Sequence, residues 1–429
     1  MWYDKLLKAW NIKEVRNALL FVVVMLVVFR LAAHIPIPGV DLVRLRNFFQ
    51  ANQFLGLLNL FSGGTIQNFS VVALGVAPYI TSSIIFQLLT MVVPRLEELS
   101  KEGEQGQRRI TQWTRLASVP LAFIQSYGLI GLLSRGGAAG AGGIFLDLTP
   151  FRMVLMMLTM TAGTIFLMWI GELISEKHVG NGISLLIFSG IIAGLPGALR
   201  SLFVTFDRAQ VINLIIFAII GIITVIGVVI MTEGQRNIPV SYARRVIGSS
   251  GVGGVSTHLP LRVNMAGVIP IIFAISLILF PTLIAQFFVS AQTDWVASFA
   301  QWIIAIFQNQ LFYGIFYFLL VFGFTFFYTA VVFHPEQIAE NLQKQGGFIP
   351  GIRPGKQTEE YLSRVTNRIL LFGALFLGAI AILPLIMQQI TGNTNLLIGG
   401  TSILIVVSVA IEIAKQIEGQ ISMHEYEKY

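Results

Sequence analysis

The sequence predicts an α-helical protein that crosses a membrane many times. Hydrophobic residues make up 55% of the 429-residue chain and charged residues only 11%, against roughly 25% charged residues in soluble domains. Long stretches carry no charge, among them those from Arg46 to Arg95, from Arg262 to Asp294 and from Arg368 to Glu412. Because about 20 apolar residues in a helix cross a bilayer core, some of these stretches hold more than one membrane element.

Ten membrane spans follow from reading the apolar runs together with their Gly, Pro and polar breaks. They lie near residues 16–33, 73–93, 114–134, 152–173, 182–199, 211–232, 262–284, 310–333, 368–389 and 396–414. Lys5, Lys8, Lys13 and Arg16 precede the first span, and no cleavable signal is expected there. Most of the 28 Lys and Arg residues then fall on the side of the N-terminus, so the positive-inside rule places both termini in the cytoplasm.

Residues 54–72 are apolar but do not read as a membrane span. They are broken by Ser62-Gly63-Gly64, by Asn68 and by Ser70. Irregular backbone at membrane depth is tolerated only where protein buries it or where it lines a watery cavity. We therefore expect a short re-entrant half-helix at about 57–70, with an amphipathic segment at the outer interface as the alternative.

Two predicted cytoplasmic loops, at about 233–261 and 334–367, are long and basic. Their cations include Arg236, Arg244, Arg245, Lys344, Arg353, Lys356 and Arg364. Arg353 lies within Gly-Ile-Arg-Pro-Gly, where Pro and Gly favour a fixed turn. A cation on such a turn is suited to an acidic partner or to RNA phosphates. The alternative is that these charges only set the membrane topology.

The predicted spans are nearly free of ionisable side chains, and no carboxylate lies at mid-depth. Ion-coupled carriers and proton pumps usually need such groups along their pathway. A neutral pathway is closed by shape or by an apolar constriction that dewets. The chain has no Cys and no phosphate-binding or metalloprotease motif, so we predict no enzymatic activity, no cofactor and no metal.

Blocks of residues along the chain resemble the SecY family, whose members form the channel of the Sec protein translocase. The blocks are Asn59 to Gly64, Ala73 to Val76, Pro78 to Ile80, Lys101 to Glu104, Arg108-Arg109, Gly180 to Ser184, Ser256 to Pro260, Asn264 to Pro270, the Arg353 turn and Gly399 to Ser402. They keep their order and spacing from the first external loop to the tenth span. The resemblance therefore covers essentially the whole chain.

This resemblance implies an all-α fold in which two inverted five-helix halves, residues 1–200 and 201–429, surround an hourglass pore. The re-entrant half-helix then corresponds to a plug that closes the outer funnel, with Leu58, Phe61, Ser62, Gly63, Gly64 and Thr65 among its residues. The second and seventh spans correspond to a lateral gate toward lipid, where the polar residues are Thr81, Ser82, Ser83, Gln87 and Asn264. The alternative is that these residues make ordinary packing contacts between helices.

Six isoleucines correspond to the pore ring of the family. They are Ile80, Ile84, Ile187, Ile191, Ile272 and Ile405. The first two pairs are each spaced i, i+4, so both members of a pair lie on one helix face. Stiff β-branched side chains make a defined collar that favours no particular sequence in a translocating chain.

The resemblance also implies the activity, the partners and the location. The expected activity is passage of unfolded secretory polypeptides and lateral release of transmembrane segments into the lipid bilayer. Expected partners are the small subunits SecE and SecG, the motor ATPase SecA, the ribosome, signal sequences and nascent polypeptides, with docking at Arg244, Arg245, Arg353 and Lys356. The expected location is the bacterial inner membrane. The Gly/Ser-rich run 248–254 departs from the family pattern at the tip of the first basic loop.

Two other functions compete with this interpretation. A small-solute secondary transporter shares an inverted repeat with broken helices, but the missing mid-membrane charges and the large basic loops argue against it. An intramembrane enzyme needs a polar catalytic set at depth, and no predicted span contains His or Asp.

Overall fold

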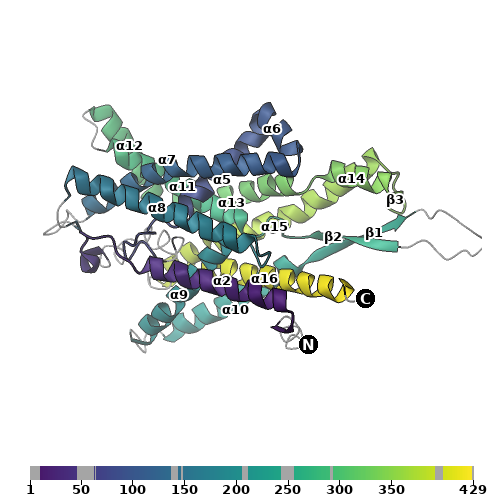
Figure 1. Ribbon diagram of the computed structural model, residues 1–429, viewed down its shortest axis with the longest axis horizontal. Helices are drawn as coiled ribbons and strands as arrows, with labels where there is room; N and C mark the ends of the chain where they lie inside the picture. Colours follow the sequence, from purple (N-terminus) through teal and green to yellow (C-terminus); the bar gives the residue numbers. More distant parts are fainter. Residues whose placement is uncertain are drawn as a thin grey trace, which may run out of the picture.

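Long helices run side by side along the longest axis of the computed structural model (Figure 1). The structure describes residues 10–45, 62, 64–136, 144–145, 148–204, 211–242, 256–289, 293–391 and 400–427. The first helix begins and the last helix ends toward the same side of the molecule, on the right in Figure 1. We call this side the terminal end, and the other side the opposite end.

Each of the ten predicted spans overlaps one helix of the structure. In the first half these helices are α2 (Lys13–Ala33), α5 (Ala77–Val92), α7 (Glu104–Gly136), α8 (Pro150–Ser175) and α9 (Gly182–Val204). In the second half they are α10 (Val211–Glu233), α11 (Ile269–Phe288), α13 (Gln310–Val332), α15 (Lys356–Thr391) and α16 (Gly400–Glu427). The described ranges also contain α6 (Pro94–Lys101), α12 (Asp294–Gln308) and α14 (Pro335–Lys344), which the sequence did not predict.

Six helices in the described ranges are long and apolar enough to cross a membrane. They are Lys13–Ala33, Glu104–Ser134, Pro150–Ser175, Ile215–Glu233, Gln310–Lys344 and Lys356–Met387. A seventh span results if α5 and α6 count as one, although they are bent by 100°. The shorter apolar helices are Gly182–Gly197, Ile269–Thr282 and Asp294–Phe307. The structure therefore supports a multi-span helical protein, while the count of ten stays a prediction.

The bend between α5 and α6 follows from Pro94. Proline disfavours helical backbone in the residue before it, and it is well tolerated at the first position of a helix. Val93 accordingly has extended backbone, with φ −101° and ψ 111°, and α6 starts at Pro94. The predicted second span, 73–93, thus ends where α5 ends, and α6 leaves the bundle beside the terminal end (Figure 1).

The terminal end carries a small sheet that the all-α expectation missed. Strands β1 (Gln235–Tyr242) and β2 (Ser256–Arg262) pair antiparallel, with Ile238 opposite Leu259, and the short β3 (Gly347–Phe348) pairs with the other edge of β1. Burial alternates along β1, so Ile238 and Val240 are both 1% exposed. They pack with Leu342 of α14 and Leu362 of α15 in one apolar cluster. The predicted loop 233–261 is therefore an ordered hairpin where the structure describes it.

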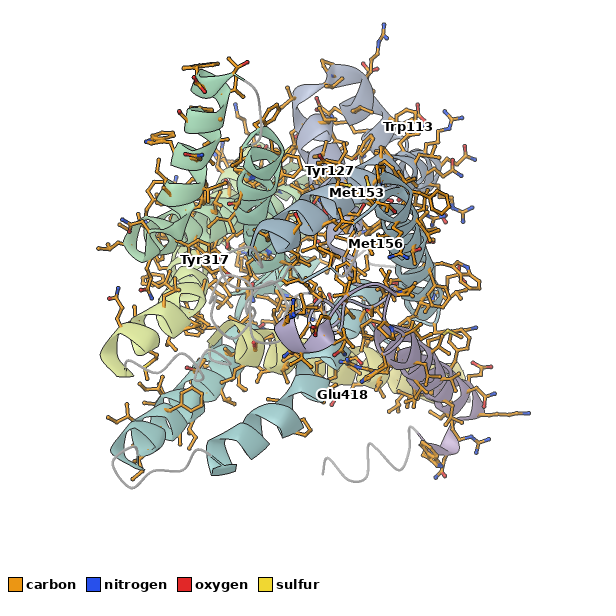
Figure 2. All side chains as sticks on the ribbon, turned by 90° about the vertical axis from the view of Figure 1, so that its left-hand side faces the viewer. Trp113, Tyr127, Met153, Met156, Tyr317 and Glu418 are labelled. Carbon is orange, nitrogen blue, oxygen red and sulfur yellow. The ribbon has the colours of Figure 1, made fainter. Side chains whose placement is uncertain are left out.

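The largest apolar cluster of the described residues lies where nine long helices meet: α2, α5, α8, α9, α10, α11, α13, α15 and α16. A second cluster joins α7 and α8 to residues 66–74 and to the segments around Ile37 and Ile144. Figure 2 views the molecule from the opposite end and labels Met153 and Met156 of α8, which belong to this second cluster. The first cluster contains the isoleucines predicted for the pore ring, and the second contains part of the segment before α5.

Candidate functional site

The six isoleucines predicted for the pore ring are all buried in one apolar cluster. Ile80 and Ile84 come from α5, Ile187 and Ile191 from α9, Ile272 from α11 and Ile405 from α16. None of the six is more than 6% exposed. Four helices that are far apart in sequence thus bring the six side chains into the centre of the bundle. The six isoleucine side chains disfavour water because they offer it no hydrogen-bond partner.

The segment before α5 is buried but is not a regular helix. Leu58, Phe61 and Gly63 of the predicted plug lie outside the described residues, whereas Ser62, Gly64 and Thr65 lie inside them. Residues 65–69 form turns and Ser70 forms an isolated bridge with Pro36, so the predicted half-helix does not extend to residue 70. Gly64 at φ +80° and Phe69 at φ +43° have left-handed backbone, which a right-handed helix does not accommodate.

Thr65 satisfies polar groups within this segment. Its side chain is completely buried, and its Oγ1 donates to the carbonyl oxygens of Ser62 at 2.8 Å and of Ala73 at 3.2 Å. Gly75, at φ +60°, lets the backbone of Ser62 approach, since a Cβ on Gly75 would lie 3.2 Å from the Ser62 Cα. The segment is therefore folded back on itself, and its irregular backbone is buried by protein.

Neighbouring elements hold the same segment from two sides. The carbonyl oxygen of Val71 faces Gly163 of α8 so closely that a Cβ there would lie 2.1 Å from it. On the other side, Ile37 N donates to Phe69 O at 2.9 Å and Val71 N donates to Ile35 O at 3.0 Å. These contacts fix residues 69–71 between α8 and the chain that follows α2.

The predicted lateral gate corresponds to α5 and α11, which contact each other in the bundle. Thr81 Oγ1 donates to Ala77 O at 3.0 Å and accepts from Gln125 Nε2 of α7 at 3.4 Å. Gln87 Nε2 donates to Ser83 Oγ at 3.2 Å, and Asn264 Nδ2 donates to Gly267 O at 3.1 Å. These bonds stay within α5, reach α7, or stay in the turn before α11. Within the described ranges, none of them crosses from α5 to α11.

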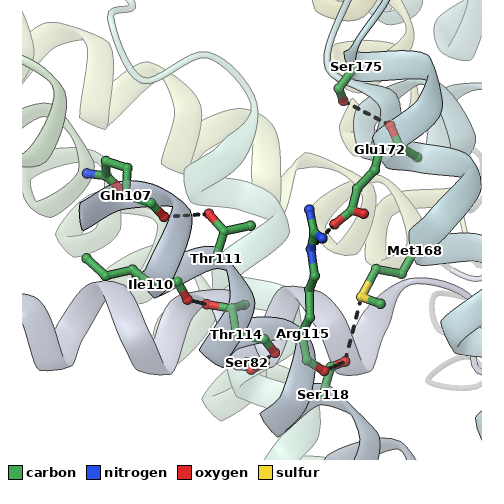
Figure 3. A network of polar contacts seen from close by, with 11 residues as sticks. Ser82, Gln107, Ile110, Thr111, Thr114, Arg115, Ser118, Met168, Glu172 and Ser175 are labelled. Carbon is green, nitrogen blue, oxygen red and sulfur yellow. Dashed lines mark hydrogen bonds and ion pairs between the residues drawn. The ribbon is translucent and has the colours of Figure 1, made fainter. Parts of the chain in front are cut away.

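A polar network that the sequence did not predict links α5, α7 and α8 (Figure 3). Ser82 Oγ of α5 donates to Thr114 O of α7 at 2.7 Å. Further along α7, Arg115 pairs with Glu172 of α8 at an Nε–Oε1 distance of 2.5 Å, and Ser118 Oγ lies 3.8 Å from Met168 Sδ. Helix α5, one of the two helices in the α5–α11 contact, is thus joined by polar bonds to α7, and α7 is joined to α8.

The main chain of the Arg353 turn is held by a buried residue, while its charged side chain is exposed. Thr358, 2% exposed, donates its Oγ1 hydrogen to Arg353 O at 2.9 Å, and Ile349 is 3% exposed in the cluster under the sheet. The side chains of Arg353 and Lys356 are exposed. Gly351 at φ +83° and Gly355 at φ +96° allow the tight backbone. Arg244 and Arg245, the other predicted docking residues, lie outside the described residues.

A cavity of about 380 Å³ with a mixed polar and apolar lining opens between the sheet and the apolar cluster. Its lining comes from α9, α10, α11, α13, α16 and the end of β2, and includes Asn181, Ser184, Arg262, Asn264, Glu412 and Lys415. Lys415 Nζ also pairs with Glu233 Oε1 of α10 at 2.9 Å. The charged and amide groups in the lining of this cavity differ from the apolar side chains of the six buried isoleucines. Across the described ranges, no group of three His, Asp or Glu side chains could hold a metal ion.

Residues 70–414 match the sequence pattern that defines SecY. The chain belongs to the SecY family. It is 45% identical to the protein translocase subunit SecY of Streptomyces coelicolor, over 98% of each chain. SecY-family membership makes the chain a channel subunit of a protein translocase rather than an enzyme, and decides against both competing functions.

Solved structures share the SecY-family fold. One is described as showing that the plug domain of the SecY protein stabilises the closed state of the translocation channel and maintains a membrane seal; it has a TM-score of 0.61 and 20% identity, with 92% of this chain and 90% of that chain covered. Another is Sec61 in the canine ribosome–channel complex from the endoplasmic reticulum, with a TM-score of 0.58, 19% identity and the same coverage. At these identities the likeness establishes the fold.

Proposed function

We propose that unfolded secretory polypeptides cross the membrane through the cluster formed by Ile80, Ile84, Ile187, Ile191, Ile272 and Ile405. The observation that carries the proposal is that all six side chains, which come from four helices, are buried in one apolar cluster. At rest the six side chains seal the path by excluding water. During translocation they deform around the chain and contact it without selecting its sequence.

The plug and the gate complete this proposal. Residues of about 57–70 close the outer side of the path at rest, and the turns around Thr65 form the base of that plug. Transmembrane segments leave for lipid between α5 and α11. This parting is eased because the hydrogen bonds of Thr81, Ser83, Gln87 and Asn264 do not join the two helices.

Ten spans in two inverted halves, residues 1–200 and 201–429, form the scaffold of the proposed channel. Both termini lie in the cytoplasm of a bacterium, and the channel lies in the inner membrane. The small subunits SecE and SecG complete the complex. The exposed Arg353 and Lys356, together with Arg244 and Arg245, dock the motor ATPase SecA or the ribosome. A ribosome–channel complex of a structurally similar protein supports the second partner.

Photocrosslinking in reconstituted translocase tests the path. A photoreactive residue is placed at Ile191 in the cluster, or at Ile222 of α10, which is 61% exposed on the outside of the bundle and serves as the control. A secretory polypeptide is stalled during translocation by a folded domain at its C-terminus. The proposal expects crosslinks from position 191 that disappear when the polypeptide is released, and none from 222. Equal crosslinking at both positions would place the path elsewhere.

A further inference from the structure

Helix α12 lies between α11 and α13 and has three different faces. It begins at Asp294, a few residues after α11, and a single residue, Asn309, separates it from α13. With 3.6 residues per turn, its residues divide into an aromatic stripe, a polar stripe and a stripe of aliphatic residues with Phe307, each about a third of a turn from the next. Two faces suffice for a helix on a soluble protein. A third face needs a separate explanation.

The aromatic stripe consists of Trp295, Phe299 and Trp302, spaced i, i+4, i+7. Their side chains are 74%, 51% and 58% exposed. The rings stack along the helix, with centroids 6.2 Å apart between Trp295 and Phe299 and 5.8 Å apart between Phe299 and Trp302. The stripe is thus a preformed apolar ridge that nothing in the described chain covers.

Of the other two stripes, one is polar and exposed, and the other packs against protein. Asp294, Ser298 and Gln301 form the polar stripe and are exposed. On the inner stripe, Ala300 is 2% exposed, and Phe307 packs edge-on against Phe312 of α13 with ring centroids 5.7 Å apart. The aromatic ridge therefore faces a third environment, which is neither the protein interior nor the polar side of the helix.

The position of α12 identifies that environment. Gln310, two residues beyond the end of α12, is the first residue of a candidate membrane span, so the C-terminal end of α12 is held at the level where that span leaves the bilayer. Asn309 fixes this corner, because its Oδ1 accepts from Leu311 N at 3.0 Å and from Phe312 N at 3.3 Å. Trp is enriched at this level in membrane proteins, since its ring prefers the headgroup region.

We propose that α12 lies in the plane of the bilayer interface and inserts Trp295, Phe299 and Trp302 among the lipid headgroups. The polar stripe then faces water and the inner stripe faces α13, so each face has its matching environment. The proposal rests on the chain lying in a membrane and not on the path that a polypeptide takes. Lipid is favoured over a protein partner because the ridge adjoins a membrane span directly.

Spin labelling tests this assignment in the full chain. The protein has no Cys, so single labels are introduced as Trp295→Cys, Phe299→Cys and Trp302→Cys, with Ser298→Cys and Gln301→Cys as controls on the polar stripe. The labelled protein is reconstituted into liposomes of phosphatidylethanolamine and phosphatidylglycerol. Collisions with oxygen report lipid exposure, and collisions with a water-soluble nickel chelate report water exposure.

We expect labels on the aromatic stripe to collide several-fold more with oxygen than with the nickel chelate, and labels on the polar stripe to show the reverse. Nickel access at all five positions would mean that the ridge faces water and would overturn the assignment. Protection from both reagents at 295, 299 and 302 would mean that a protein covers it, which also overturns the assignment.

A second measurement needs no label. Phospholipids brominated near the headgroup quench the tryptophan fluorescence of the parent protein, which has six Trp residues. The variant Trp295→Phe/Trp302→Phe keeps the apolar ridge but should lose a clear share of the quenchable emission. If the quenched fraction is unchanged, these two tryptophans do not touch lipid.

Discussion

Ser82 of α5 donates its hydroxyl hydrogen to the main-chain carbonyl of Thr114 on α7, at an Oγ–O distance of 2.7 Å. Both residues are buried, at 1% and 4% exposed. This bond joins the helix that carries Ile80 and Ile84 to the rest of the first half of the bundle. In the proposed lateral opening, this bond would hold α5 to α7 while α5 parts from α11.

Replacing Ser82 by Ala should loosen α5 from α7. Hydrogen bonds between membrane helices contribute about 0.6 kcal/mol on average and at most about 1.7 kcal/mol, so we expect a loss of stability in this range. The measurement is reversible unfolding of the purified protein in bicelles. Ser126→Ala is the matched control, because Ser126 is also buried but its hydroxyl, among the described residues, bonds within α7, to Phe123 O at 2.8 Å. An equal effect of the two variants would contradict the role given to the interhelical bond.

Replacing Thr65 by Val should weaken the resting seal. Valine has nearly the same shape but no hydroxyl, so the carbonyls of Ser62 and Ala73 lose their donor, at a cost of about 1–3 kcal/mol for buried groups. In planar bilayers the resting channel should conduct ions more often, while translocation of a secretory polypeptide continues. Thr111→Val is the control, since the Thr111 hydroxyl bonds Gln107 O at the surface of α7. If resting conductance stays at the parent level, the turns around Thr65 do not hold the plug.

The sequence was sufficient to place the helices, because each predicted span is an apolar run that overlaps one helix of the structure; six helices in the described ranges are long and apolar enough to cross a membrane. It was not sufficient for the terminal end. Strand β1 alternates correctly, with Ile238 and Val240 buried, but Pro239 within it and Pro260 within β2 are unusual in strands and hid the hairpin. Proline is accommodated here in a short antiparallel ribbon, whose burial against α14 and α15 supplies the stabilisation.

Pairwise contacts were also beyond prediction from one sequence. All six predicted ring residues are buried together, yet the sequence contained no signal that Ser82 faces Thr114 or that Arg115 faces Glu172. Such pairs join helices whose relative rotation is set by packing along their whole length. Helix α12 was missed for a different reason: at 15 residues it is shorter than the roughly 20 apolar residues that a membrane span needs.

Replacing Arg353 by Ala should weaken docking of a cytoplasmic partner. The exposed guanidinium sits on a turn whose carbonyl is fixed by Thr358, and loss of one cation should lower the salt dependence of ribosome binding by about one phosphate contact. Sedimentation binding assays at several salt concentrations measure this. Arg364→Ala removes an exposed charge from α15 outside the turn and is the control. Equal losses for both variants would mean that total charge, rather than the turn, governs docking.

Replacing ring isoleucines by Ser should make the resting channel leak ions. Ile191→Ser together with Ile272→Ser introduces two hydroxyls into a cluster whose members are nearly inaccessible to water. Hydroxyls give water hydrogen-bond partners and the shorter side chains widen the constriction, so dewetting is lost and ions follow the water.

The matched control is Ile222→Ser with Ile226→Ser on α10, two isoleucines that are 61% and 53% exposed. We expect single-channel recordings in planar bilayers to show resting conductance for the first variant and none for the second. Since both variants lose the same atoms, a closed channel in both cases would move the seal away from these isoleucines, and a leak in both would show that general loosening of the bundle is enough to open it.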